Sequence, residues 1–445
     1  MLISLKFSNL LSFKDEAGFS MLKGSQHIHK NHIIPGALRG LNLLKMAAVY
    51  GGNASGKSNF ILAMVSLKNL VTRPRGSSTG LELRKFKLDK KSNSKPQNFE
   101  VIFQTSNSRV FKLKISLNDF KVIQESLTLI RPSTEIQIYD RKWNGVAYEY
   151  SDIKLDVDIE LKARIGYIAQ DTRSNQLFLS ALVERNIELL KDAYEWFSKQ
   201  LVIVRPESHH SHIPFFIGDD KFIKRFTTIL SGLDTGIECI KLVKVNVAEA
   251  KIPSEVMQNV KDALHKSPKE GDMLMFAMQV GKSTRYSFKL DSKGEILAFK
   301  LITQHKDSNG KLIDFELYEE SSGTQRLFDI IPFLIEQNQG NNVLFVDELS
   351  RSLHPDLSIS LIKNFLDSDT GHSQLIMATH ESELLKTLLR RDEIWFVDKK
   401  RDQGSYLHSL EDSGIRNDLD VLRSYRAGRF GGRPIIRQSM VAGYE

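Results

Sequence analysis

The sequence predicts an α/β protein in which a mixed N-terminal β subdomain and a parallel-sheet core are interrupted by a helical insertion. Three observations predict this class. An apolar strand at 46–50 runs directly into a glycine-rich turn and then into a helix with apolar spacing. Residues from about 80 to 170 alternate between polar and apolar side chains, as strands do. The last third of the chain alternates short apolar runs with helical patterns, which is typical of a parallel sheet.

The same patterns place each element along the chain. At the N-terminus, Ile3, Leu5 and Phe7 share one face of a strand. The expected strands are 3–7, 46–50, several within 80–170, further ones within 273–301, and 343–346, 374–378 and 394–397. The expected helices are 59–70, 176–199, 254–265, 324–336, 357–366 and 382–389.

Composition narrows the class of protein further. Of the 445 residues, 41 % are hydrophobic and 26 % are charged, which excludes wholesale disorder and fibrous folds. The only cysteine, Cys239, cannot form an internal disulfide, and this fits a reducing cytoplasm. The longest apolar stretch, about 327–335, is too short to span a membrane, and the N-terminus lacks the pattern of a secretion signal. The net charge of +8 permits a nucleic-acid or acidic partner without requiring one.

The glycine-rich turn at 51–58 has the pattern G-x-x-x-x-G-K-S between a strand and a helix. Backbone N–H groups of such a loop point at phosphate oxygens, and the positive end of the following helix strengthens the attraction. We expect Lys57 to reach the β- and γ-phosphates of ATP and the Ser58 hydroxyl to ligate Mg²⁺. The predicted nucleotide-binding residues are Gly51, Asn53, Ala54, Ser55, Gly56, Lys57, Ser58 and Asn59.

An acidic pair follows a buried strand nearly 300 residues later. Asp347 and Glu348 come at the carboxyl end of the strand at 343–346, where ligands bind in parallel sheets. Asp347 is expected in the Mg²⁺ shell, and Glu348 is the expected base for the attacking water. His380 ends another strand at the same edge and is a candidate sensor of the γ-phosphate, although a strand-end histidine is more often structural.

These motifs, in this order, resemble ABC-type ATPases of the SMC and RecF class. The segment Ser321–Arg326 (SSGTQR) resembles the signature motif of that family, and the segment at 349–355 resembles the loop that crosses its dimer interface. The resemblance implies that Ser322 and Gly323 bind the γ-phosphate held by an opposite subunit, so that two heads enclose two nucleotides. It implies that His380 is the switch histidine. Gln170, expected after an apolar strand at 165–169, is the candidate for the family's glutamine that contacts Mg²⁺ and water.

On this resemblance the chain divides into four regions. These are 1–173, the first part of the ATPase head with the phosphate loop; 174–270, a helical insertion lobe; 271–420, the second part of the head; and 421–445, a basic tail. The tail carries five arginines and no acidic residue from 421 to 444: Arg423, Arg426, Arg429, Arg433 and Arg437. They could face an acidic partner or nucleic-acid phosphate, or could pack the tail on the core; the sequence favours neither.

The two ends of the chain carry a narrower resemblance. Asn9–Phe13 (NLLSF) and Tyr425–Pro434 (YRAGRFGGRP) look like segments of the compact ABC-type ATPases of bacterial phage-defence operons, in particular those of PARIS-type systems. That resemblance implies an oligomeric ATPase which restrains a separate TOPRIM-type nuclease and releases it when a phage-encoded protein is sensed. About 50 residues follow the last expected strand, too few for a TOPRIM domain in this chain.

Two alternative functions and one further signal bear on this interpretation. A RecF-like DNA-repair ATPase would need a basic stripe, whereas the excess of 62 basic over 54 acidic residues is mild. A transporter subunit is disfavoured because Lys57 and Ser322 lie more than 260 residues apart and the signature is not that of transporters. A histidine-rich segment, with His209, His210 and His212, is interpreted as a polar loop and not as a metal site.

Overall fold

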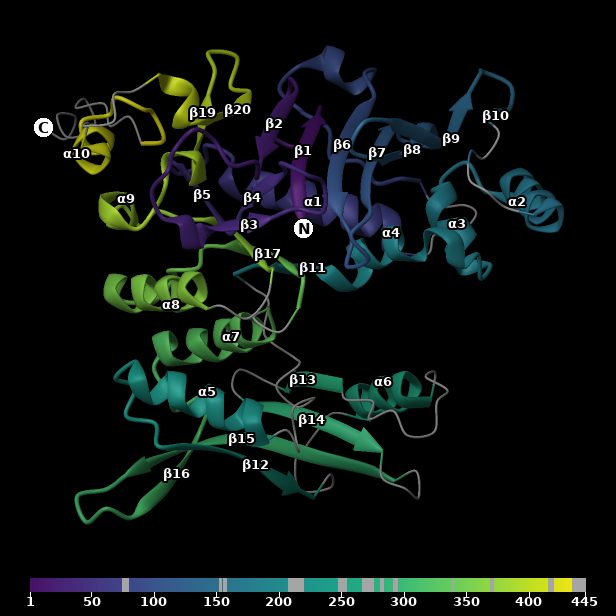
Figure 1. Cartoon of the computed structure of the whole chain (residues 1–445). Coiled ribbons are helices and arrows are strands. Elements are labelled where there is room, and N and C mark those ends of the chain that lie inside the picture. The colour runs from purple at the N-terminus through teal and green to yellow at the C-terminus, as the bar shows by residue number, and fades with distance from the viewer. Residues whose placement is uncertain are drawn as a thin grey trace, which may run out of the picture. The chain divides into compact units, whose positions relative to one another are not determined.

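The computed structural model describes residues 1–73, 80–151, 154, 158–206, 220–246, 254–265, 276–280, 284–290, 295–337, 340–368, 372–414 and 420–433 (Figure 1). The chain forms two compact units. Unit 1 comprises Met1–Arg205, Gly340–Leu349 and Ile362–Glu445, and unit 2 comprises Pro206–Gln339 and Ser350–Leu361. The histidine-rich segment with His209, His210 and His212 lies outside the described residues.

The core of unit 1 is a six-stranded sheet in the order β11-β17-β18-β5-β19-β20. Neighbouring strands are parallel except for β20, which is antiparallel to β19. The strands are β11 (Leu201–Val204), β17 (Val343–Asp347), β18 (Gln374–Ala378), β5 (Met46–Gly51), β19 (Ile394–Lys399) and β20 (Ser405–Ser409). Every residue of β5, β17 and β18 is buried, as expected for parallel strands covered on both faces. The predicted parallel core is confirmed.

A second, seven-stranded antiparallel sheet in unit 1 has the order β10-β9-β8-β7-β6-β1-β2. Its strands are β1 (Leu2–Ser8), β2 (Ala17–Ser20), β6 (Gln97–Gln104), β7 (Val110–Leu117), β8 (Val122–Ile130), β9 (Glu135–Trp143) and β10 (Tyr148–Tyr150). Helix α1 (Lys57–Thr72) joins the two sheets through Phe60. The Phe60 ring centroid lies 5.0 Å from that of Phe19 on β2 and 6.0 Å from that of Phe345 on β17. The predicted N-terminal β subdomain is also confirmed, and its sheet is antiparallel throughout the described strands.

The region around 160–200 differs from its predicted structure. Residues 159–171 form helix α2 (Ile159–Asp171) and not the expected strand, and α3 (Phe178–Glu184) and α4 (Lys191–Glu195) follow. These helices belong to unit 1, because the Trp196 and Phe197 rings lie 4.5 and 5.2 Å from the ring of Phe103 on β6. The structure therefore places residues 174–205 with the head and not with the inserted lobe expected at 174–270.

Unit 2 combines a sheet with helices. Its sheet has the order β12-β15-β14-β13, with β16 also paired to β15. The strands are β12 (Cys239–Val245), β13 (Phe276–Val280), β14 (Thr284–Leu290), β15 (Ile296–Lys306) and β16 (Leu312–Glu316). The helices are α5 (Asp220–Gly232), α6 (Ser254–His265) and α7 (Ser322–Gln337), and α8 (Pro355–Asp367) begins in this unit. The Phe226 ring of α5 lies 5.1 Å from the Phe328 ring of α7. The helical insertion expected at 174–270 contains a strand in addition to its helices, because β12 pairs along its whole length with β15.

The remaining elements of unit 1 are short. They are the two-stranded sheet β3 (Ile33–Pro35) and β4 (Asn42–Leu44), and the helices α9 (Leu384–Thr387) and α10 (Val421–Arg426). Among the helices that the structure describes, none is long and apolar enough to cross a membrane.

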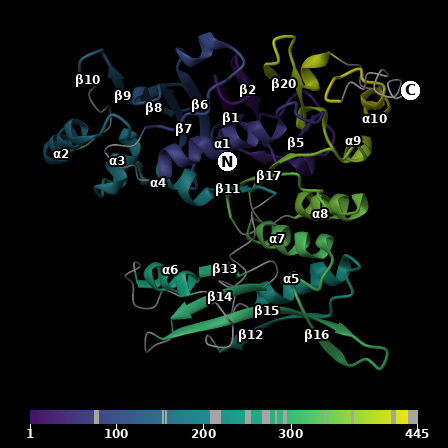
Figure 2. The ribbon, with the colours of Figure 1, turned by 180° about the vertical axis from the view of Figure 1, so that it is seen from behind.

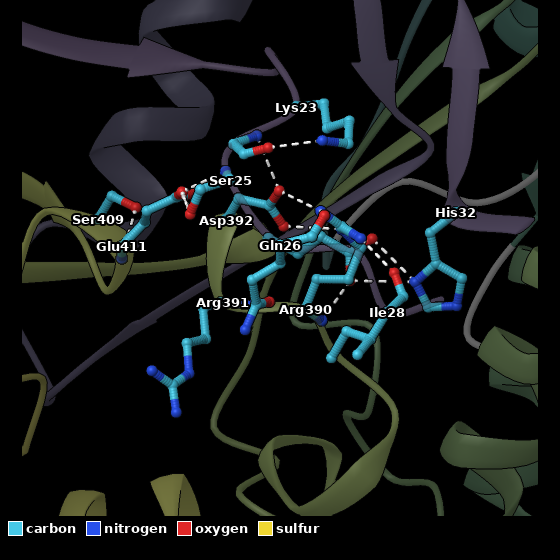
Figure 3. Close-up of polar contacts among 12 residues, drawn as sticks. Lys23, Ser25, Gln26, Ile28, His32, Arg390, Arg391, Asp392, Ser409 and Glu411 are labelled. Atoms are coloured by element: carbon cyan, nitrogen blue, oxygen red, sulfur yellow. Dashed lines mark hydrogen bonds and ion pairs between the residues drawn. The ribbon is translucent and has the colours of Figure 1, made fainter. Parts of the chain in front are cut away.

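A dense polar network fixes the segment at 24–32 to the start of β19 (Figure 3). The fully buried guanidinium of Arg390 is paired with Asp392 at 2.6 Å and donates hydrogen bonds to the carbonyl oxygens of Gln26 and Ile28. One residue further on, the buried Glu393 carboxylate lies 2.9 Å from Nδ1 of His32. Burial raises the pKa of Glu393. A buried charged side chain without a partner lowers the stability of the fold, so each charged residue of this network needs its partner to remain charged and buried.

Candidate functional site

The carboxyl ends of three adjacent strands form the base of the site. Asp347 on β17 lies beside Ala378 on β18, and Ala378 lies beside Val49 on β5. A hydrogen bond of 3.1 Å from the Thr379 N–H to the Val49 carbonyl extends this register past the end of β18. Because neighbouring strands are about 4.8 Å apart, Asp347 lies on the order of 10 Å from the strand that leads into the glycine-rich turn. The fold thus brings residues almost 300 positions apart to one edge (Figure 1).

The glycine-rich turn has the backbone conformation of a loop that wraps around an anion. Ala54 and Gly56 have positive φ values of 60° and 123°, and the α1 helix begins directly after Gly56. Positive φ is costly for most L-residues, which explains a glycine at the more extreme position. The buried ammonium of Lys57 donates hydrogen bonds of 2.8 and 3.2 Å to the carbonyl oxygens of Gly51 and Gly52. Lys57 is thereby folded back over its own loop.

Two serines from distant segments support this turn from behind. Ser405 at the start of β20 donates a hydrogen bond to the Ser55 carbonyl oxygen, and its Oγ lies 2.8 Å from the Ser12 Oγ. Ser12 also accepts a 2.8 Å hydrogen bond from the Asn59 side chain. A Cβ atom at Gly56 would lie 2.5 Å from the Ser405 Oγ and 2.8 Å from the Ser12 Oγ. Sequence reasoning gave neither serine a role in the loop, because nothing in a linear motif shows which distant segment packs behind it.

The acidic pair lies within electrostatic reach of Lys57. Burial lowers the pKa of Lys57, and the negative charges of Asp347 and Glu348 act in the opposite direction. Asp347 is only 5 % exposed, whereas Glu348 is half-buried. Glu348 has a φ of 53°, a strained conformation for glutamate, and it redirects the chain immediately after the strand. Such strain at a strand end is frequent at functional sites.

His380 belongs to the same electrostatic group. Its pKa is lowered from the usual 6.5, first by partial burial and second by the positive charge of Lys57, while Glu348 opposes both. The segment that carries it is held to β5, because the Tyr50 hydroxyl donates a 3.0 Å hydrogen bond to the Glu381 carbonyl oxygen. The lowered pKa favours the neutral form of the imidazole at pH 7.

The oxygen ligands around the turn fit magnesium better than a transition metal. Among the described residues, no group of three or more His, Cys, Asp and Glu side chains could hold a metal by itself. Magnesium bound to a nucleotide needs only one or two protein oxygens, because phosphates and water complete its shell. The exposed Ser58 at the start of α1 and the carboxylate of Asp347 are groups of this type.

The predicted signature motif lies at the start of α7 in unit 2. The Ser321 hydroxyl accepts a 3.1 Å hydrogen bond from the Thr324 N–H and so caps the helix, while Ser322 is exposed. A Cβ atom at Gly323 would lie 2.8 Å from the Ser352 carbonyl oxygen, so glycine allows the segment at 350–355 to pass close to the helix. The helix of 16 residues therefore presents an exposed serine at its positive end.

Within unit 1, Gln170 is a predicted site residue that the fold does not bring to the turn. It is exposed near the end of α2. Figures 1 and 2 both show α2 beyond β9 and β10, at the opposite end of unit 1 from β19 and β20. Strand β19 pairs directly with β5, which leads into the glycine-rich turn. The apolar run at 165–169 was expected to be a strand, but Ile165, Ile168 and Ala169 form the buried side of a helix.

The described part of the basic tail packs on the core. The Tyr425 and Phe430 rings lie 5.9 and 6.0 Å from the ring of Phe396 on β19, and the Gly432 N–H donates a 2.7 Å hydrogen bond to Asp398. Arg426 forms an ion pair with Glu383 at 2.5 Å. In residues 420–433 the aromatic side chains thus pack on the core, while the four arginines in this range, Arg423, Arg426, Arg429 and Arg433, are exposed, and Arg437 lies outside the described residues.

The chain matches a protein-family model over most of its length. The model of a family described as "AAA domain, putative AbiEii toxin, Type IV TA system" matches residues 46–386, which is more than half of the chain. The matched range contains both the glycine-rich turn and the acidic strand. No curated protein matches the chain.

Solved structures with low sequence identity are also similar to the chain. An SMC head bound to the C-terminal winged-helix domain of ScpA has 13 % identity and a TM-score of 0.38, with 93 % of this chain and 99 % of that chain covered. The SMC head domain from Thermotoga maritima has 12 % identity and a TM-score of 0.36, with 92 % and 98 % covered. The recombination mediator protein RecF of the RecFOR pathway has 14 % identity and a TM-score of 0.36, with 92 % and 98 % covered.

Proposed function

The chain belongs to the AAA-domain family described as putative AbiEii toxins of type IV toxin–antitoxin systems, and we propose that it is an ATPase of the ABC type whose catalytic residues are Lys57, Glu348 and His380. ATPase activity follows from the family. The observation that supports these residue roles best is the strand register, in which Asp347 at the end of β17 lies beside Ala378 of β18, and Ala378 lies beside Val49 of β5, the strand that leads into Lys57. The assignment is tested by measuring ATP hydrolysis by the purified chain. We expect Lys57→Ala and Glu348→Gln each to abolish it.

Each residue has a role that follows from its position. Lys57 leaves the carbonyl oxygens of Gly51 and Gly52 and stabilises the charge that develops on the transferred phosphoryl group. Bound Mg²⁺ would neutralise phosphate charge, with Ser58 and Asp347 as its protein ligands. The Glu348 carboxylate orients the attacking water and takes its proton. Neutral His380, beside Lys57 and Glu348, donates a hydrogen bond toward the γ-phosphate.

The complete site requires two copies of the chain. Ser322 and Gly323 begin a 16-residue helix whose positive end suits an anion, and Ser322 is exposed. We infer that they bind the γ-phosphate held by a partner copy, as the resemblance to ABC-type ATPases implies. ATP binding then closes a pair of heads, hydrolysis opens them, and unit 2 transmits the change. Pairs of this kind could associate into a higher homo-oligomer.

The biological role we propose is that of a sensor and scaffold in bacterial antiviral defence. The support is the resemblance of the Asn9–Phe13 and Tyr425–Pro434 segments to the PARIS ATPase subunit AriA, together with the toxin–antitoxin description of the family. In this role the chain assembles with a separate TOPRIM-type nuclease, restrains it, and releases it when a phage-encoded protein is sensed. Co-purification with the products of neighbouring genes tests the proposal: a nuclease that leaves the complex when the trigger is added supports it.

A RecF-like or SMC-like ATPase that binds DNA is the second function considered. The net charge of +8 permits it but is a mild excess for a DNA-binding surface. Binding to duplex DNA that weakens steeply with salt would support this function, because neutralised phosphates release counterions. Absence of such binding at low salt would favour the protein partner instead.

A further inference from the structure

A cavity of about 500 Å³ lies along the second half of α1, away from the glycine-rich turn. Its wall is formed by α1 from Leu62 to Arg73, by the segment at 80–84 and by Gln97 and Arg205, all within unit 1. The volume lies in the range of small-molecule sites in proteins. None of its lining residues belongs to the predicted nucleotide site. We refer to it as the α1 cavity.

Positive charge surrounds an apolar floor in the α1 cavity. Leucine and valine side chains of α1, with Leu81 and Leu83, supply the floor, and Arg73, Arg84 and Arg205 line the rim. One carboxylate, that of Glu82, also lines it, so the charge of the lining side chains is +3 − 1 = +2. Like charges gathered around one cavity repel one another, and a bound anion removes that cost.

Two of these arginines lack an acidic partner within the part of the chain that the structure describes. Across the described residues, neither Arg73 nor Arg84 forms a side-chain ion pair or hydrogen bond. Two other basic groups nearby are satisfied: the buried Lys85 pairs with Asp119 at 2.9 Å, and Lys68 donates a 2.6 Å hydrogen bond to the Leu201 carbonyl oxygen. Among the described residues, no side chain or carbonyl oxygen therefore occupies the guanidinium groups of Arg73 and Arg84.

From these observations we propose that the α1 cavity binds a small phosphorylated ligand with an apolar or aromatic part, of about nucleotide size. Guanidinium groups recognise phosphate with paired, charge-assisted hydrogen bonds, which favours phosphate over a single carboxylate. The leucine-rich floor receives the apolar part. The site is separate from the glycine-rich turn, so it accepts its ligand whether or not ATP is bound there.

The cavity is also connected to the glycine-rich turn through main-chain contacts. The Leu11 N–H donates a 2.6 Å hydrogen bond to the Arg84 carbonyl oxygen, and the adjacent Ser12 supports the turn. Helix α1 itself begins at Lys57 and ends beside Arg73. A ligand on the rim therefore lies against the end of α1 and against Arg84, whose carbonyl oxygen is hydrogen-bonded to the segment that supports the phosphate loop.

Titration calorimetry with inorganic pyrophosphate tests the proposal on the full chain carrying Lys57→Ala, in which the glycine-rich turn no longer competes. We expect saturable binding that weakens at least about tenfold in the Arg73→Gln/Arg84→Gln double variant. The matched control, Arg39→Gln/Arg131→Gln, changes two exposed arginines outside the cavity and should bind as before. Absence of binding to the Lys57→Ala chain, or equal binding by the double variant, overturns the proposal.

Two further measurements test where pyrophosphate binds and whether phosphate is the preferred group. Hydrogen exchange at residues 80–84 should slow on addition of pyrophosphate in the chain with native arginines, and unchanged exchange there contradicts the placement of the site. A hexaglutamate peptide should compete at least about tenfold more weakly than pyrophosphate. Equal competition would show that the cavity binds acidic peptide segments, and the assignment to a phosphorylated ligand would be wrong.

Discussion

The Lys57 ammonium lies 2.8 Å from the Gly51 carbonyl oxygen, so the lysine expected to hold phosphate closes over its own loop. The loop is backed by Ser12 and Ser405, and the acidic strand end lies opposite. Entry of a triphosphate requires Lys57 to exchange two carbonyl acceptors for phosphate oxygens. That exchange is favourable, because hydrogen bonds between charged groups are about twice as strong as those to neutral acceptors.

Lys57→Ala should therefore remove nucleotide binding. The loss of a charge-assisted contact in a buried site corresponds to a decrease in ATP affinity of about 100-fold or more. Equilibrium binding of a fluorescent ATP analogue measures it, with the exposed Lys87→Ala as control. An affinity equal to that of the unchanged chain would refute the role of Lys57.

Glu348→Gln should preserve binding and stop turnover. Glutamine keeps the shape of the side chain but accepts no proton, and loss of a general base lowers kcat by about 10²- to 10⁴-fold. Single-turnover hydrolysis and ATP retention check both halves of the prediction. Glu381→Gln serves as the control, because Glu381 lies three residues after the end of β18 and has no proposed catalytic role. Normal turnover by Glu348→Gln would exclude Glu348 as the base.

Mixing two inactive variants tests the shared site. If Ser322 acts on the nucleotide of a partner copy, Lys57→Ala and Ser322→Arg chains should be inactive alone and partly active together, because mixed pairs retain one intact site. Steady-state ATPase rates as a function of mixing ratio give the answer. Mixtures that remain inactive at every ratio would remove the support for an in-trans role.

The protonation of His380 provides a pH-dependent test. Burial and Lys57 lower its pKa from 6.5, so the folded chain takes up this proton only at lower pH than the unfolded chain does. The contribution of His380 to stability is therefore complete above pH 6.5 and is lost as the pH falls toward its folded pKa. NMR titration of the ring should show a midpoint below 6.5 that moves upward in Lys57→Ala. A midpoint insensitive to that substitution would contradict the proximity of the two groups.

Much of this site could be predicted from sequence, because its residues follow short apolar strands with distinctive composition. Glycines, Lys57 and the acidic pair each carry a local pattern. The order of the strands in the sheet has no such local pattern. Strand β18 lies between β5 and β17 only in the folded sheet. The same is true of Ser12 and Ser405, which meet behind the loop although 393 positions separate them.

The errors in the sequence-based prediction have a common physical origin. The run at 165–169 is apolar, short and free of proline, and a run of that length fits a strand or the buried side of a helix equally well. Its neighbours at 159–164 form one helix with it, so Gln170 lies on a helix and not at a strand end. In unit 2, β12 is recognisable only through its partner β15, which lies about 60 residues later.

The Arg390 network predicts a large stability effect away from the catalytic groups. Arg390→Met should lower the free energy of unfolding by about 3–5 kcal/mol, because it leaves Asp392 buried without its partner. Thermal and urea unfolding measure the change, and the exposed Arg39→Met is the control. A loss no larger than that of the control would show that Asp392 is satisfied by other groups.

The central claim, that the glycine-rich turn and the acidic strand end meet at one magnesium–nucleotide complex, is tested most directly by an experimental structure of the Glu348→Gln chain with ATP and Mg²⁺. We predict the γ-phosphate within hydrogen-bond distance of the Lys57 ammonium, and the metal bound through Ser58 and through Asp347 directly or by way of water. A nucleotide found elsewhere, or a metal with neither residue in its surroundings, would contradict it.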